Sequence, residues 1–322
     1  MSAKRLFELR RTRSFGQKLE GTFEFIRLNV KPLFKSLLFF SGPFALVGTF
    51  LVSNIFTASF AAGINANAGV DSSMNEVMSI GMSALGFMFM MAFAGAMIIS
   101  TIYACVRCYE QNGSADYTTQ DVWARVKKVY WSIFGTTFLY GIIFFILYLV
   151  IMIPMALLTV ILSFLTIPLV YIFIGFYMTV MFTALPVQIF EGVGIGTALN
   201  KSFRLLKGHW WSSLGLLILL MLIYNVVIMV FAIPFYVSLF ANYFTTTGTD
   251  LMEETPTYVI LLNYLFGIIF LLGSFITYSV PLVGLTIQYF SLSEEKDATA
   301  LMRKIDAFGT ESTDNEEEEE YH

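Results

Sequence analysis

The sequence is poor in charged residues. Only 13% of its 322 residues are Asp, Glu, Lys or Arg, whereas 57% are hydrophobic. A soluble domain carries about 25% charged residues. Apolar runs of about 20 residues, the length that crosses a bilayer, recur along the chain. This composition excludes an ordinary soluble domain and predicts an all-α, polytopic integral membrane protein.

Cysteine and histidine are scarce as well. Two cysteines, Cys105 and Cys108, are too few for a disulfide framework. Their CxxC spacing could supply half of a zinc site, but the only histidines are His209 and His322. We interpret the pair as two thiols at a helix end, and we predict no metal site and no cofactor.

Carboxylates are absent from the interior of the apolar runs. Proton and cation pumps usually need a buried ionisable residue, so ion-coupled transport is disfavoured. The interior polar groups are neutral, and Asn225 is the one nearest the centre of a run. Asn225 could line a polar path, but we favour a hydrogen bond to a neighbouring helix.

The chain divides into three predicted parts. Residues 1–31 form a basic arm, residues 32–293 a six-span membrane domain, and residues 294–322 an amphipathic helix with an acidic tail. The run from 133 to 190 exceeds one crossing, so we expect a hairpin that turns near residues 154–168. The expected spans are 33–60, 77–106, 133–155, 164–190, 212–240 and 257–292.

Basic residues are missing from two connections, 61–76 and 241–257. All 19 Lys and Arg lie in the N-terminal arm extended to Lys35, in two later loops or in the C-terminal segment. Loops rich in Lys and Arg stay in the cytoplasm. Six spans with both termini in the cytoplasm satisfy this distribution throughout.

An amphipathic segment accompanies each predicted hairpin. Apolar residues at i, i+4 and i+7 share one face of a helix. The pattern indicates either a threefold repeat of amphipathic helix plus hairpin or convergence among interfacial helices. The stripes are Leu19/Phe23/Ile26, Val122/Val126/Val129, Leu199/Phe203/Leu206 and a last one, Leu301/Ile305/Phe308.

Residues 191–215 hold the clearest of these segments. The glycines at 192, 194 and 196 lack the spacing and the preceding strand of a dinucleotide site, so we interpret them as a flexible turn. The cations lie off the apolar face, and tryptophans prefer the membrane interface. The candidates for binding lipid or a partner are Lys201, Arg204, Lys207, Arg125, Lys127, Lys128, Trp210 and Trp211, with Glu191 and Asn225 as polar candidates.

This segment resembles a motif of bacterial six-span proteins grouped around the membrane domain of glycerophosphodiester phosphodiesterases and related families of unknown function. Glu191 ends an even-numbered span, a Gly-rich turn and residues 198–202 (Ala-Leu-Asn-Lys-Ser) follow, and Trp210-Trp211 re-enter the membrane. The resemblance covers about 25 residues and the span layout. It implies a bacterial cytoplasmic membrane protein without catalysis of its own, since no room remains for a barrel of about 250 residues.

Three functions stay open. We favour a non-catalytic scaffold or accessory subunit whose interfacial helices dock other membrane proteins or anionic lipid. The second is a carrier or permeation pathway for a lipid or hydrophobic small molecule. The third is a membrane enzyme that uses Glu110, Glu191, His209 and Glu294, but we find no catalytic constellation and expect no enzyme. Nucleic-acid binding is not expected, because no reader motif is present.

Overall fold

The computed structural model describes residues 7–67, 74–248 and 257–298, and all regular secondary structure in these residues is helical. This confirms the all-α class. After α6 and a turn at Tyr278, the chain continues as a helix over residues 279–298. The elements are α1 (Phe15–Asn67), α2 (Met74–Asn112), α3 (Thr119–Glu191), α4 (Ile195–Leu206), α5 (Trp210–Gly248) and α6 (Thr257–Thr277).

Six helical segments are long and apolar enough to cross a membrane, which confirms a six-span protein. Two of them include the amphipathic segment that precedes the apolar run: α1 starts at Phe15 and α3 at Thr119. Helix formation is cooperative, so a helix started at a cap continues into the apolar run. The segments are Phe15–Ser59, Val77–Asn112, Thr119–Ile151, Val170–Glu191, Trp210–Ala241 and Thr257–Ala298.

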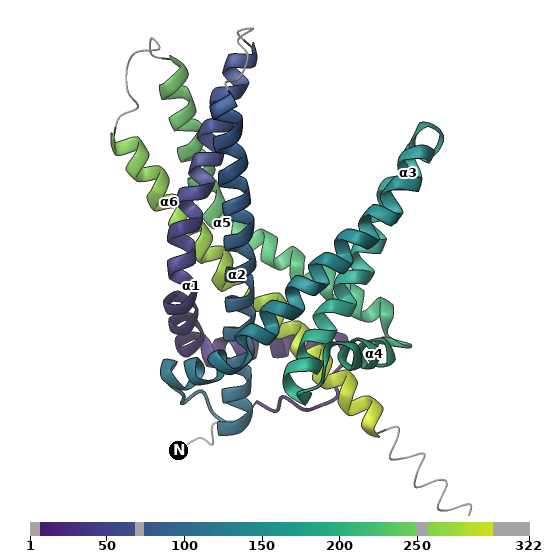
Figure 1. Cartoon of the computed structure of the whole chain (residues 1–322). Coiled ribbons are helices and arrows are strands. Elements are labelled where there is room, and N and C mark those ends of the chain that lie inside the picture. Colours follow the sequence, from purple (N-terminus) through teal and green to yellow (C-terminus); the bar gives the residue numbers. More distant parts are fainter. Residues whose placement is uncertain (1–6, 68–73, 249–256, 299–322) are drawn as a thin grey trace, which may run out of the picture.

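The long element α3 folds back on itself as an antiparallel hairpin (Figure 1). The hydroxyl of Tyr177 donates a hydrogen bond to the carbonyl of Tyr140, and the rings of Phe144 and Phe173 stack at 6.5 Å. The reversal lies between the two spans, Thr119–Ile151 and Val170–Glu191.

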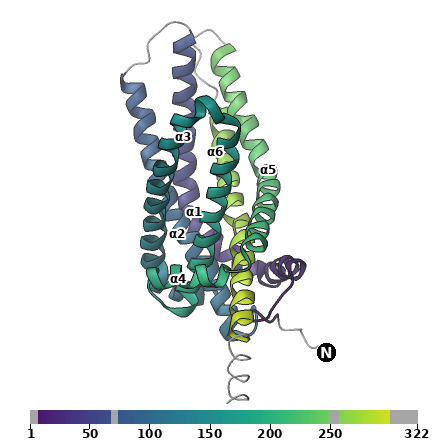
Figure 2. The same ribbon diagram turned by 90° about the vertical axis from the view of Figure 1, so that its right-hand side faces the viewer.

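The helices form a bundle from which the α3 hairpin diverges (Figures 1 and 2). Helices α1, α2 and α6 lie together with the part of α5 that is distant from α4. The α3 hairpin leans away from them. We call the end that carries residues 7–14, the connection 113–118 and α4 the base. Residues 36–106, 129–200 and 208–295, whose described parts run away from the base and return to it, contain no Lys or Arg.

The core lies in the base half of the bundle. Every residue of 279–293 is buried, so this helix is surrounded by the others. Pro281 lacks an N–H group, and the helix is interrupted at Tyr278 just before it. The largest fully buried side chains include Phe25, Tyr103 and Tyr289, which come from three different helices.

The apolar stripes and the buried faces coincide in only one helix. Val122 and Val126 of α3 are fully buried, but Phe23 of α1 and Phe203 of α4 are 43% and 51% exposed. The inward faces mix apolar side chains with small and polar ones, which allow close helix contact and hydrogen-bond to their own helix. The inward residues are Thr22, Phe25 and Asn29 in α1, and Ala198, Ser202, Leu205 and Leu206 in α4, so Leu206 is the one member of the α4 stripe that is buried. The fourth stripe, Leu301/Ile305/Phe308, and the acidic tail lie outside the described residues.

Candidate membrane-surface site

Three helices that run towards the base, α2, α3 and the helix 279–298, meet near their C-terminal ends in an aromatic cluster. The ring of Phe190, at the end of α3, lies 5.0 Å from that of Phe290 and 6.2 Å from that of Tyr289. Tyr103 of α2 approaches the same Phe190 ring at 6.1 Å. The cluster holds α2, α3 and the helix 279–298 together where α4 leaves the bundle.

Glu191 connects α4 to this cluster. Its carboxylate accepts a 2.7 Å bond from Lys201 Nζ and a 2.7 Å bond from the hydroxyl of Tyr289. The next residue, Gly192, has φ 68°, a left-handed conformation that favours glycine, and its N–H caps α3 on the carbonyl of Gln188. The C-terminus of α3 is therefore capped by Gly192. Glu191 fixes the direction in which α4 departs.

Of the basic residues around α4 that we predicted to bind lipid or a partner, one is paired and two are exposed. Lys201 is engaged by Glu191, whereas Arg204 and Lys207 are exposed. Trp210 packs between Phe176 and Phe203, with ring centroids at 5.3 and 6.0 Å. Trp211 also contacts Phe176 but stays 74% exposed. The exposed surface where α4 is followed by α5 thus combines two cations with a tryptophan.

The predicted cations at the start of α3 divide in the same way. Arg125 is partly buried, and its Nε lies 2.9 Å from Sγ of Cys108. Lys127 and Lys128 are exposed, and Nζ of Lys127 lies 5.3 Å from the centre of the Trp123 ring. The two lysines are thus exposed, whereas Trp123 packs on Phe40 of α1 and is 37% exposed.

Asn225 does not form the expected interhelical hydrogen bond within the described part of the chain. Its side chain is exposed and donates at 2.7 Å to the carbonyl of Met221, one turn earlier in α5. The register of α5 turns this position outward, and the bond to its own helix satisfies the amide there.

Two glutamines make the interhelical bonds instead. Gln188 Nε2 donates to Ser132 Oγ at 3.2 Å and to Thr136 Oγ1 at 2.8 Å, and Gln288 Nε2 donates to Ser213 Oγ at 2.7 Å. Each bond joins the end of a hairpin to its beginning. The available sequence signal was the shared Gln-x-Phe pattern at 188–190 and 288–290.

Three of the four residues considered for catalysis are held in separate structural pairs, and the fourth, Glu294, forms no ion pair with the described residues. Glu110 pairs with Arg10 at 3.0 Å, Glu191 with Lys201, and His209 lies 3.3 Å from Glu295. Within the described ranges, no group of three His, Cys, Asp or Glu is arranged to hold a metal ion. Each pair links two segments of the base, which is a structural role.

Residues 7–14 form a strap across the base. The backbone N–H of Phe7 donates to the Tyr109 hydroxyl at 3.1 Å, and that of Arg13 donates to Ser291 Oγ at 3.0 Å. Between them, the Arg10 guanidinium lies 5.3 Å above the Phe290 ring. The strap therefore ties the end of α2 to the helix 279–298.

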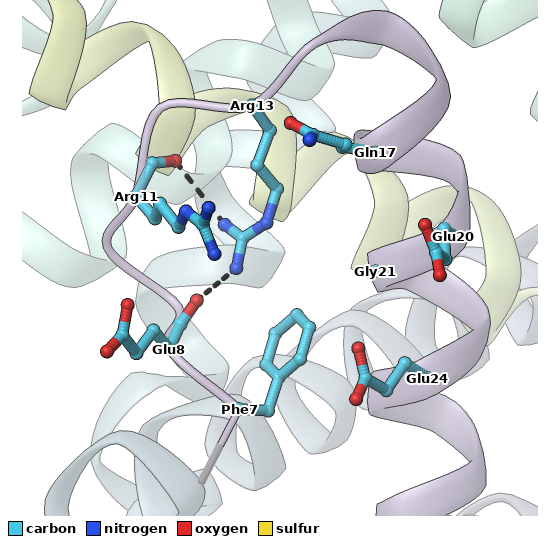
Figure 3. Close-up of a pocket in the computed structure, with 8 residues that line it drawn as sticks. All are labelled: Phe7, Glu8, Arg11, Arg13, Gln17, Glu20, Gly21 and Glu24. Carbon is cyan, nitrogen blue, oxygen red and sulfur yellow. Dashed lines mark hydrogen bonds between the residues drawn. The ribbon is translucent and has the colours of Figure 1, made fainter. Parts of the chain in front are cut away.

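The strap and the start of α1 enclose a pocket of about 520 Å³ (Figure 3). The guanidinium of Arg13 donates hydrogen bonds to the backbone carbonyls of Glu8, Leu9 and Arg11. Its Cζ lies 4.9 Å from the centre of the Phe7 ring. Burial, and then the charge of Arg11, lower the pKa of Arg13. Its donors hold the strap in place, so they are not directed at a ligand. The lining residues are Phe7, Glu8, Arg11, Arg13, Gln17, Glu20, Gly21 and Glu24.

The geometry defines a six-span, all-α membrane protein with a basic, tryptophan-rich base. No family model, no curated protein and no solved structure matches the chain.

Proposed function

We propose that the protein is a non-catalytic scaffold or accessory subunit that docks other membrane proteins or anionic lipid on the outward surface of its base. The observation that carries this proposal is the exposure of two tryptophans where helices re-enter the apolar region. Trp131 and Trp211 are 69% and 74% exposed, next to the exposed cations of α3 and α4. Exposed tryptophan together with cations suits the headgroup layer and charged lipid.

The same proposal assigns the base to the cytoplasm and the protein to a bacterial cytoplasmic membrane. Support for the orientation is the concentration of Lys and Arg at the base, which the positive-inside rule places in the cytoplasm. Support for a bacterial origin is the resemblance of residues 191–211 to the bacterial six-span motif. Cysteine labelling from each side of the membrane, at exposed positions of the base, tests the orientation.

Reversing the charge of Arg204 is expected to weaken association with anionic lipid or a partner while leaving membrane insertion intact. One basic residue near an anionic surface contributes about 1 kcal/mol, so Arg204→Glu should reduce association at least about fivefold. Recovery of cross-linked partners and of co-purified anionic lipid by mass spectrometry measures the effect. Arg204→Lys, which keeps the charge, is the matched control.

Two outcomes of the Arg204 experiment count against the proposal. Unchanged recovery of lipid and partners in Arg204→Glu would remove α4 from the docking surface. Loss of insertion would instead assign Arg204 a purely topological role.

A lipid carrier is the second candidate, and the divergence of the α3 hairpin favours it. Only 17% of the apolar window in the outgoing arm, Thr119–Ile151, is buried, against 50% in the returning arm, Val170–Glu191. A hairpin that leaves the bundle gives acyl chains access to its inner face. Reconstituted protein should then accelerate the movement of a fluorescent phospholipid between leaflets, and equal rates in empty vesicles would exclude this role.

A further inference from the structure

A second hollow opens at the base between the beginning of the apolar part of α1 and the N-terminus of α3. Its volume is about 450 Å³. The buried ring of Phe40 stacks on Trp123 at 4.9 Å with an angle of 25° between the rings, which closes one side. Phe39, 72% exposed, borders the other side. We call it the α1–α3 groove, and its lining residues are Lys35, Phe39, Phe40, Thr118, Thr119, Gln120 and Trp123.

Two lysines border the α1–α3 groove. Lys35 lines it and is exposed, and Lys127 places its ammonium 5.3 Å from the Trp123 ring. None of the described lining residues is acidic. The nearby Asp121 is engaged in the cap of α3, where its Oδ2 accepts bonds of 2.8 and 2.7 Å from the N–H and hydroxyl of Thr118.

We propose that the α1–α3 groove binds one anionic phospholipid. The phosphate lies at Lys35 and the beginning of α3, and an acyl chain runs along Phe39 and Trp123. This inference rests on the proposed role of the base as a lipid-contacting surface, and it adds a defined site and a lipid class.

The position of the groove supports a lipid over a soluble ligand. Its polar lining comes from residues 118–120, before or at the first turn of α3, and its aromatic lining comes from residues that begin the apolar run of α1. Beside the groove, Phe34 and Leu38 of α1 are 47% and 42% exposed. An occupant must therefore be polar at one end and apolar along its length, which describes a phospholipid.

The two lysines support an anionic headgroup over a zwitterionic one. Neither Lys35 nor Lys127 forms an ion pair with another residue of the described chain. Loss of either lysine is expected to reduce the preference for an anionic lipid about fivefold, the factor that corresponds to about 1 kcal/mol per basic residue at an anionic surface.

Tryptophan quenching tests the site directly on the full-length protein. Replacing Trp131, Trp210 and Trp211 with Phe leaves Trp123 as the only tryptophan. In phosphatidylcholine nanodiscs with a minor share of brominated lipid, brominated phosphatidylglycerol should quench Trp123 more than brominated phosphatidylcholine at the same mole fraction. Lys35→Ala and Lys127→Ala should each remove most of that difference, whereas Arg11→Ala, at an exposed cation of the strap, should leave it unchanged.

Equal quenching by the two brominated lipids would overturn the proposal, because Trp123 would then contact only ordinary boundary lipid. A preference for phosphatidylglycerol that survives loss of both lysines would overturn it too. Native mass spectrometry of the otherwise unmodified protein supplies a second readout, since Lys35→Ala should lose one tightly bound phosphatidylglycerol that Arg11→Ala retains. Partner recovery should not change in Lys35→Ala, so failure of the groove and failure of the scaffold role are distinguishable.

Discussion

Replacing Glu191 with Ala is expected to lower the free energy of unfolding by about 2 kcal/mol and to loosen α4. The substitution removes the acceptor of two 2.7 Å hydrogen bonds, from Lys201 Nζ and from the Tyr289 hydroxyl. The side chains of Lys201 and Glu191 are 26% and 23% exposed, so we expect less than the loss of about 3–5 kcal/mol that follows from breaking a fully buried pair. The remaining cation would lie in a partly dry site without a counter-charge.

Matched variants separate the contributions to this loss. Glu191→Gln keeps an oxygen that can accept from Tyr289 but removes the negative charge, and Tyr289→Phe removes only the hydroxyl. Thermal unfolding in detergent should rank Glu191→Ala as the least stable of the three. Because Lys201 would no longer need a partner, Glu191→Ala combined with Lys201→Ala should cost less than the sum of the single changes.

Limited proteolysis supplies a readout that global stability does not. Residues 192–194 connect α3 to α4, and Glu191 is the residue that fixes this turn to the cluster around Tyr289. Cleavage at the turn should rise in Glu191→Ala more than in a variant of equal thermal stability elsewhere. Unchanged cleavage together with unchanged unfolding would show that α4 is held by its buried residues alone.

The sequence predicts the membrane layout because the relevant forces act over long windows. A run of about 20 apolar residues is costly to leave in water, whatever the order of the residues within it. The concentration of cations at one end, seen at Arg204 and Lys127, is likewise a property of whole loops. Six spans and an all-α fold can therefore be derived without knowledge of any single contact.

The faces that pack together are less predictable, because lipid is as apolar as a protein core. Hydrophobicity alone therefore does not decide whether Phe203 points to the bundle or away from it, and in the structure it is exposed while Ser202 is buried. Asn225 and Gln188 illustrate the same limit, since a rotation about the helix axis decides which amide meets a neighbour. Pairs such as Arg10 and Glu110, 100 residues apart, carry no local signal.

Gly284→Ala is expected to destabilise the bundle by about 1–3 kcal/mol, because the added methyl group has no room. A Cβ at this position would lie 2.5 Å from Cδ1 of Leu220 and 3.1 Å from Oγ1 of Thr22. Both neighbours are fully buried side chains, on α5 and α1, so a change of rotamer in either would press on the surrounding core. The helix propensity gained by Ala over Gly, about 1 kcal/mol, offsets only part of this loss.

Two glycines of α3 provide matched controls for Gly284. Gly135 and Gly141 are helical, and a Cβ added to either meets nothing within 4 Å. Gly135→Ala and Gly141→Ala should keep the melting temperature or raise it. Equal melting temperatures for Gly284→Ala and these controls would contradict the close contact of three helices at residue 284.

A size exchange tests whether Leu220 is the group that resists the methyl. Leu220→Ala removes the two methyl groups nearest to Gly284, at 2.5 and 3.0 Å from the added Cβ, and creates a cavity of its own. With Leu220→Ala already present, Gly284→Ala should cost little or stabilise, because the methyl group then fills part of that cavity. If Gly284→Ala lowers the stability by the same amount in the Leu220→Ala background, the methyl group clashes with Thr22 and not with Leu220. The crossing of α1 over the helix 279–298 would then be the tightest contact of the base.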